Sequence, residues 1–305
     1  MRLGVLGLGA MGRRHLSAAR ATSDLEVVGV ADPSAGAHGQ GADVPVVGSL
    51  GALLGMGVDA CVVAAPSPQH LAAAIELAAA GVHVLMEKPL AMDVAECAQI
   101  VEAFAGTDAI VRVGHVERFN PALVALRNRL EHGELGDLLE IVTRREGGPP
   151  TRHDGGDVLL DLGTHDFDLV GWLTASPVRP VSVSASPIGC APRSEAVRVE
   201  LTLAHGLVTS HSFSWCAPQR VRTLAVRGTA GTLVADTLAG DLRSGRGESL
   251  GVPQRDPLTA QLQAWCDVIR GRLDPHDPRS GAGLLDGAQA VGVAGAVMAA
   301  SGDRP

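Results

Sequence analysis

The chain has 305 residues, a formal net charge of −8 and 46% hydrophobic residues, which is enough for two domains that each bury a core. The acidic balance and the lack of a basic stripe argue against nucleic acid and anionic membranes as partners, and the late apolar stretch 288–300 is too short to span a bilayer. Five scattered cysteines without a CxxC pair indicate a reduced, cytoplasmic protein, and a first strand predicted from Arg2 leaves no space for a signal peptide.

Short apolar runs alternate with helical stretches in the first part of the chain. We predict strands at Arg2–Leu6, Leu25–Ala31, Asp59–Ala64, His83–Met86 and Ile110–Gly114. Helices are predicted at Met11–Ala21, Pro68–Ala80 and Asp93–Ala105. Strands that are hydrophobic throughout and alternate with helices are typical of a parallel, doubly wound sheet.

The pattern changes after Gly114. The next predicted elements are a helix, a strand, a Gly- and Pro-rich loop and a second helix, at Pro121–His132, Leu139–Glu146, 147–156 and Asp157–Leu173. Five runs with β character follow without intervening helices, at Val181–Ile188, Ala196–Ala204, Leu207–Trp215, Val221–Arg227 and Thr232–Asp236. Two final helices are predicted, at Pro257–Arg270 and Leu284–Ala300. We therefore predict an α/β protein with a doubly wound nucleotide-binding domain at 1–117 and an α+β domain with an open, mainly antiparallel sheet at 118–305.

A glycine-rich turn joins the first predicted strand to the first helix. It reads Gly-Leu-Gly-Ala-Met-Gly and fits the GxGxxG pattern of Rossmann domains in the expected strand–turn–helix context. Gly7 permits the tight turn, Gly9 lets a pyrophosphate approach the backbone, and Gly12 allows the helix to pack closely. Ala10 and Met11 complete the predicted cofactor-binding turn.

Asp32 ends the second predicted strand, 20 residues after Gly12. A carboxylate at this position accepts hydrogen bonds from the adenosine ribose hydroxyls and repels a 2′-phosphate. This favours NAD over NADP as the cofactor, although Arg13 and Arg14 lie nearby in the sequence.

Two features of the composition bear on catalysis. The chain has no tyrosine, which excludes mechanisms that need a tyrosine acid or base. Of its 25 lysine and arginine residues, only Lys88 is a lysine, and it lies two residues after Met86, which ends the fourth strand of the predicted parallel sheet. Open α/β sheets bind ligands at the carboxyl ends of their strands, so the position of Lys88 indicates a catalytic role. The alternative is a surface lysine retained by chance.

A second candidate cluster lies on the helix predicted after the glycine-rich loop. Asp161 and His165 are four residues apart, so they share one helical face, and a carboxylate beside an imidazole makes a competent general base. The alternative is an ordinary solvated pair, with Asp157 and Asp168 also on a wet face.

These motifs together resemble the glucose–fructose oxidoreductase/inositol dehydrogenase (Gfo/Idh/MocA) family over nearly the whole chain. The matching segments are the Gly7–Gly12 turn, Pro66–His70, Glu87-Lys88-Pro89, Gly114–Pro121 and the Asp161/His165 helix. The resemblance implies a Rossmann domain and an α/β domain whose open sheet forms subunit contacts. It also implies that Lys88 and His165 flank the reacting carbon beside the nicotinamide.

The same resemblance extends the predicted sites. It implies cofactor contacts from Ala65, Pro66, His70, Glu87, Lys88 and Arg118, and substrate contacts from Lys88, Glu117, Asn120, Arg152, Asp161 and His165. Two structural alternatives remain open. Glu117, Arg118 and Asn120 could instead cap a domain-linking helix, and Arg152 could lie in a solvated loop.

The predicted activity is the NAD-dependent oxidation of a secondary hydroxyl of a sugar, nucleotide sugar or glycoside, at the 3-position by resemblance. An inositol or cyclitol dehydrogenase is the first alternative, followed by a keto-sugar reductase, an NAD-dependent glycoside hydrolase and a non-catalytic regulator. The sequence does not decide whether His165 or Lys88 is the immediate base, and it predicts no metal site. Because an uncovered sheet face needs a partner, we expect a homodimer or homotetramer.

Overall fold

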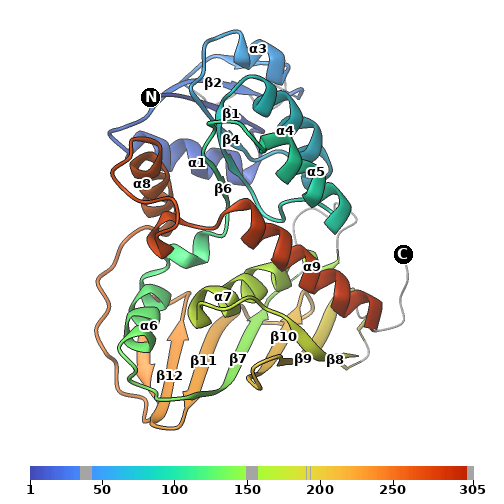
Figure 1. Ribbon diagram of the computed structural model, residues 1–305, viewed down its shortest axis with the longest axis vertical. Helices are drawn as coiled ribbons and strands as arrows, with labels where there is room; N and C mark the ends of the chain where they lie inside the picture. Colours follow the sequence, from blue (N-terminus) through green and yellow to red (C-terminus); the bar gives the residue numbers. More distant parts are fainter. Residues whose placement is uncertain (35–42, 149–156, 190, 193, 301–305) are drawn as a thin grey trace. The chain divides into compact units, whose positions relative to one another are not determined.

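The structure of the protein, a computed structural model, forms two compact units (Figure 1). It describes residues 1–34, 43–148, 157–189, 191–192 and 194–300. The first unit comprises Met1–Val116 and Asp256–Ala288, and the second comprises Glu117–Arg255 and Gln289–Pro305.

The late segment of the first unit differs from the predicted division, which placed everything after residue 117 in the second domain. Helix α8 (Pro257–Ile269) packs on α1 (Ala10–Arg20) and joins the core around the first strand. Its Trp265 is 1% exposed. Burial of such a large apolar surface explains why this helix belongs to the first unit, although it lies far along the chain.

The first unit contains a six-stranded parallel sheet in the order β3-β2-β1-β4-β5-β6. Its strands are β1 (Arg2–Leu6), β2 (Glu26–Ala31), β3 (Val46–Val47), β4 (Ala60–Val63), β5 (His83–Met86) and β6 (Val111–Val113). Its other helices are α3 (Leu50–Leu54), α4 (His70–Ala79) and α5 (Val94–Phe104). This confirms the predicted doubly wound sheet, whose strand order reverses between β1 and β4, where such sheets bind ligands. The prediction missed β3 and α3, which are too short to show a hydrophobic period.

The second unit contains a seven-stranded sheet in the order β13-β12-β11-β7-β10-β9-β8. Its strands are β7 (Leu138–Glu146), β8 (Pro180–Pro187), β9 (Ala196–Leu203), β10 (Val208–Ser214), β11 (Val221–Gly228), β12 (Gly231–Asp236) and β13 (Asp241–Ser244). Its helices are α6 (Pro121–Glu131), α7 (Thr164–Thr174) and most of α9 (Leu284–Ala300). The β7–β10 pair is parallel and the other neighbours are antiparallel, which confirms the predicted mainly antiparallel sheet.

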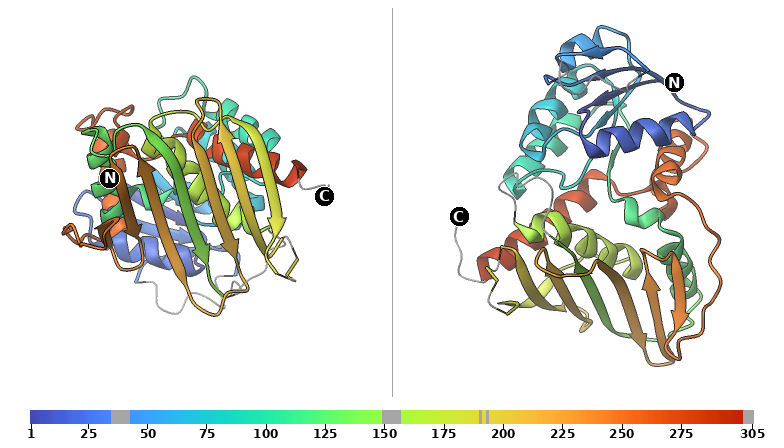
Figure 2. Two further views of the ribbon diagram at one scale, coloured as in Figure 1. Left: turned by 90° about the horizontal axis from the view of Figure 1, so that it is seen from below. Right: turned by 180° about the vertical axis from the view of Figure 1, so that it is seen from behind.

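The two faces of this sheet differ. Along β7, Thr143 and Arg145 are buried, whereas Val142 and Arg144 are exposed. Helix α7 covers the buried face, where the Phe167 ring packs edge-on against a ring of β10. The opposite face carries no helix from the described part of the chain (Figure 2, left).

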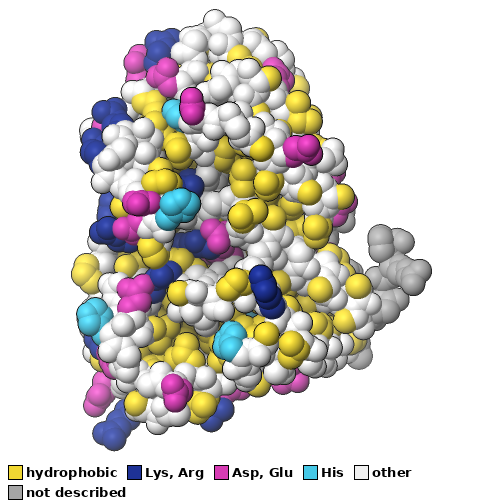
Figure 3. Space-filling view, viewed as in Figure 1, with side chains coloured by type: hydrophobic (Ala, Val, Ile, Leu, Met, Phe, Trp, Pro, Cys, Tyr) yellow, Lys and Arg dark blue, Asp and Glu magenta, His cyan; other side chains and the backbone are white. Residues whose placement is uncertain are grey.

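Acidic and basic side chains are interspersed on the face drawn in Figure 3. Within the described ranges, every helix is too short or too polar to cross a membrane. The same ranges contain no group of three or more histidine, cysteine or acidic side chains arranged to hold a metal ion.

Candidate active site

The glycine-rich turn has the geometry that its sequence predicts. Gly7 has a φ of +95°, and a β-carbon there would lie 2.6 Å from the carbonyl oxygen of Ala64. A β-carbon on Gly12 would lie 1.9 Å from the carbonyl oxygen of Gly7. Gly9 is the N-cap of α1 and supplies no side chain to the first-turn N–H groups that follow it. These N–H groups form a cradle suited to a pyrophosphate.

Asp32 supports the same turn from the end of β2. Its Oδ2 accepts a hydrogen bond from the Leu8 backbone N–H at 2.7 Å, and its Oδ1 accepts one from the Ser34 N–H at 2.8 Å. The side chain is buried, with 9% exposure. Each carboxylate oxygen can accept a second hydrogen bond, so Asp32 can hold the turn and still bind ribose hydroxyls.

His70 opens α4 and connects two loops of the first unit. Its Nδ1 lies 3.1 Å from the Pro89 carbonyl oxygen and 3.2 Å from that of Leu90, and its Nε2 lies 3.1 Å from that of Ala65. Burial lowers the pKa of His70 below its ordinary value. His70 therefore joins the loop after β4, which contains Ala65 and Pro66, to the loop after β5. Its contact with the cofactor stays a prediction.

The segment around Lys88 follows β5 and is anchored by a buried carboxylate. Glu87 Oε1 accepts a hydrogen bond from His15 Nε2 at 2.7 Å, and Oε2 accepts one from the Lys88 backbone N–H at 3.1 Å. Burial alone would raise the pKa of Glu87, but the hydrogen bond from His15 and the charges of His15 and Lys88 outweigh it and hold that pKa below its ordinary value. Glu87 is therefore an anion with both oxygens engaged.

The sequence interpretation missed His15, which is fully buried on α1. The available signal was its spacing: His15 follows Gly12 by three residues and so shares the inward face of that helix.

Asp161 and His165 lie in the second unit. Asp161 belongs to a π-helical turn, Leu159–Gly163, and His165 belongs to the first turn of α7. Both are half-buried, whereas the other residues from 158 to 170 are buried, so these two side chains form the outward face of this segment. Trp215 Nε1 donates a hydrogen bond to Asp161 Oδ2 at 3.2 Å. The shared face matches the expectation, and π-helical turns are frequent at functional sites.

Helix α7 is anchored by two buried arginines. Arg118 donates from Nε and Nη2 to the two carboxylate oxygens of Asp168, at 2.9 and 2.6 Å. Arg145 lies 2.8 Å from Asp166 Oδ1 and donates from Nη1 to Glu117 Oε1 at 2.9 Å. Asp168 is 5% exposed, which rules out the alternative that placed it on a solvent-exposed face of the helix.

The side chains of Arg118 and Glu117, for which the sequence predicts ligand contacts, therefore already take part in structural ion pairs. Asn120 also has a structural role: its Oδ1 accepts from the Ala122 N–H and caps α6, and its Nδ2 donates to the Thr237 carbonyl oxygen. Arg152 lies outside the described residues.

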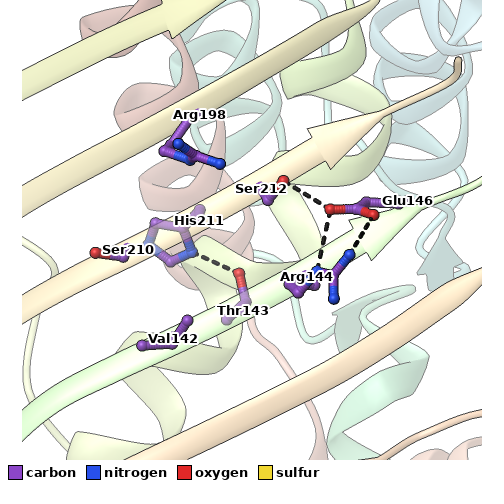
Figure 4. Close-up of a pocket in the computed structure, with 8 residues that line it drawn as sticks. All are labelled: Val142, Thr143, Arg144, Glu146, Arg198, Ser210, His211 and Ser212. Carbon is purple, nitrogen blue, oxygen red and sulfur yellow. Dashed lines mark hydrogen bonds and ion pairs between the residues drawn. The ribbon is translucent and has the colours of Figure 1, made fainter. Parts of the chain in front are cut away.

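A shallow hollow of about 240 Å³ lies on the sheet of the second unit (Figure 4). Arg144 and Ser212 hydrogen-bond Glu146 at 2.9 and 2.8 Å on its floor. The lining residues come from β7, β9 and β10 and include none of the predicted site residues. The hollow is therefore separate from the candidate active site.

Comparison with known proteins identifies the family. Residues 1–115 match the model of the oxidoreductase family with an NAD-binding Rossmann fold, and residues 123–234 match the GFO/IDH/MocA C-terminal domain. Inositol 2-dehydrogenase 4 of Saccharopolyspora erythraea is 32% identical over 327 residues, covering 98% of this chain and 93% of that protein. The rhizopine catabolism protein MocA of Rhizobium meliloti is 32% identical over 192 residues, or 61% of each chain.

A solved structure supports the same assignment over the full length. The UDP-N-acetylglucosamine 3-dehydrogenase GnnA of Acidithiobacillus ferrooxidans superposes with a TM-score of 0.86 at 26% identity, covering 98% of this chain and 97% of that one. The chain therefore belongs to the GFO/IDH/MocA family of oxidoreductases, and its first unit contains the NAD-binding Rossmann fold of that family.

Proposed function

We propose that this protein is an NAD-dependent dehydrogenase that oxidises a secondary hydroxyl, the 3-hydroxyl in a hexose, of a sugar, nucleotide sugar or glycoside. The observation that carries the proposal is the outward pair Asp161 and His165 on a segment that is otherwise buried. Such a pair can take up a hydroxyl proton. Oxidation of an inositol is the second candidate, favoured by the relatives named inositol 2-dehydrogenase.

The first unit fits an NAD cofactor. The cradle formed by Gly7, Gly9 and the first turn of α1 suits the pyrophosphate, and Asp32 suits the adenosine ribose. A carboxylate at this position disfavours a 2′-phosphate, so we propose NAD rather than NADP. When bound, NAD supplies the acceptor for the hydride.

The chain's own residues handle the proton and the developing charge. In the proposed reaction, His165 accepts the hydroxyl proton while Asp161 stabilises the imidazolium that forms. Lys88 donates a hydrogen bond to the substrate oxygen as negative charge develops on it.

The proposal requires Lys88 of the first unit and His165 of the second to act on one bound substrate. A double variant tests this requirement. If the two residues act in the same step, the double variant Lys88→Ala/His165→Ala should lose little more activity than the more damaged of the two single variants. Losses that multiply would show that the two residues act independently.

The direct test is a substrate panel. The protein is incubated with NAD+ or NADP+ and with inositols, free hexoses, nucleotide sugars and glycosides, while the absorbance of the reduced nicotinamide is followed. We expect turnover with NAD+ and one substrate class. If NAD binds but no panel member is oxidised, and no corresponding keto compound is reduced with NADH, the proposal fails.

We also propose that the uncovered face of the seven-stranded sheet mediates a homodimer or homotetramer. Exposed Val142 and Val208 lie on the surface of this sheet, and an open, partly apolar sheet face is stabilised by a partner. Replacing both valines with glutamate should dissociate the assembly in light scattering. A wild-type monomer at micromolar concentration contradicts this proposal.

A further inference from the structure

Two arginines stand directly opposite each other in the second unit. Arg222, the second residue of β11, pairs in register with Arg145 of β7. Like charges at directly opposed positions destabilise a sheet unless something compensates them. Arg145 is compensated by Glu117 and Asp166. Among the residues that the structure describes, Arg222 has no carboxylate within ion-pair distance.

The Arg222 guanidinium is nevertheless held in a fixed orientation. Its Nη1 donates to the carbonyl oxygens of Glu146, at 2.5 Å, and Val221, at 2.8 Å. These bonds use one corner of the guanidinium and leave the edge formed by Nε and Nη2. Arg118 uses this same edge to hold Asp168 in this protein. That edge matches the two oxygens of a carboxylate or phosphate.

The electrostatic surroundings of Arg222 favour an anion. Burial, with the positive charges of Arg145 and Arg220, lowers the pKa of Arg222 to about 10, against the opposing effect of Asp166 and Glu117. Burial and like charges both disfavour the charged guanidinium here, and a bound anion would relieve this effect.

Arg222 also lies at the same end of the sheet as the first turn of α7, which carries His165. It contacts the backbone of Glu146, which pairs with Ser214 at the end of β10. The next residue after Ser214, Trp215, hydrogen-bonds Asp161. Across the sheet, Arg145 contacts Asp166, the neighbour of His165.

We propose that Arg222 is a specificity residue that binds an anionic group of the substrate, a carboxylate or a phosphate, through Nε–H and Nη2–H. This inference rests on the proposed dehydrogenase function. It selects, within that function, acidic or nucleotide-linked sugars over neutral sugars and inositols.

The test measures binding rather than turnover. Isothermal titration in the presence of NAD+ compares two matched pairs: glucuronate with glucose, and N-acetylglucosamine 1-phosphate with N-acetylglucosamine. We expect the charged member of one pair to bind at least about tenfold more tightly, as a charge-assisted bidentate contact contributes. The pair that shows the difference distinguishes a carboxylate from a phosphate.

Arg222→Gln should remove this difference in affinity. Arg222→Lys should keep only part of it, because an ammonium group lacks the two parallel N–H donors of a guanidinium edge. The matched control is Arg227→Gln, which changes an exposed arginine of the same strand and should leave binding intact. Equal binding of charged and neutral probes by the wild type, or an undiminished preference in a folded Arg222→Gln variant, would overturn the proposal. Turnover of a neutral substrate that is indifferent to Arg222 would overturn this inference but leave the dehydrogenase function standing. A binding preference that depends on Arg222, without turnover of any substrate, would support this inference and contradict the dehydrogenase function.

Discussion

The segment around Lys88 and the helix that carries His165 are anchored by different chemistry. In the first unit, His15 binds Glu87 and His70 binds the carbonyl groups just after Lys88, so two buried imidazoles hold the backbone on either side of the lysine. In the second unit, two buried guanidiniums hold Asp166 and Asp168 on α7. Arginine keeps its charge throughout the working pH range, whereas imidazole does not. The arginine pairs that hold α7, the helix anchor, therefore keep their positive charges, whereas the lysine anchor around Lys88 is built from imidazoles, whose proton positions vary.

The largest expected effect comes from removing the groups that the two anchors hold. Lys88→Ala and His165→Ala should each reduce kcat by about 10²–10⁴-fold, because each removes a proton acceptor or a stabiliser of the developing charge. NAD binding, followed by fluorescence titration, should persist in both. Near-normal turnover in either variant would remove that residue from the mechanism. An active Lys88→Arg variant would reduce the role of Lys88 to a positive charge.

Breaking the helix anchor should cost the most stability. Asp168→Asn leaves the Arg118 guanidinium buried without its carboxylate, which should lower the free energy of unfolding by about 3–5 kcal/mol. Urea denaturation measures the change. The control is Glu134→Gln, which breaks an exposed pair with Arg129 and should cost less than about 1 kcal/mol. Similar losses in both variants would mean that the buried pair does not anchor the helix.

A buried imidazole should contribute to the acid response of the second unit. Burial lowers the pKa of His211 from 6.5 to about 4. The unfolded chain therefore binds a proton more readily between these pH values. The contribution of His211 to stability is complete above pH 6.5 and decreases as the pH falls, by about 3 kcal/mol at pH 4.

His211→Leu should flatten the dependence of unfolding free energy on pH in this window. Lost hydrogen bonds to Thr143 and Thr209 would lower the stability of the variant by the same amount at every pH, so the slope is the quantity to compare. An unchanged slope would assign the acid sensitivity to other groups.

The smallest effect sharpens the role of the lysine anchor. His15→Leu should leave Glu87 buried without its imidazole partner, raise the pKa of that carboxyl, and shift Lys88 enough to reduce kcat by about tenfold. The acidic limb of the pH–rate profile should move to higher pH. His15→Gln, which keeps a donor near the Nε2 position, should recover most of both effects. Equal profiles for the two variants would limit His15 to packing.

The sequence predicted those parts of the molecule that depend on local patterns. The hydrophobic strands, the GxGxxG turn and the shared face of Asp161 and His165 each follow from steric rules or periodicity within a few residues. The short β3 and α3 were missed because two to five residues carry no period. The place of Asn120 as a helix cap was among the alternatives that its spacing allowed.

Long-range pairing lay beyond any local pattern. Nothing in the chain around Arg118 or Arg145 shows that their partners stand on α7, since 50 and 21 residues separate the members of these pairs. The same holds for His15 with Glu87 and for α8, whose burial against α1 assigns a late helix to the first unit. Local sequence specifies backbone conformation and the choice of reactive side chains. Which charges are buried together depends on how distant elements pack, because a charge is stable inside the fold only where another part of the chain brings its partner.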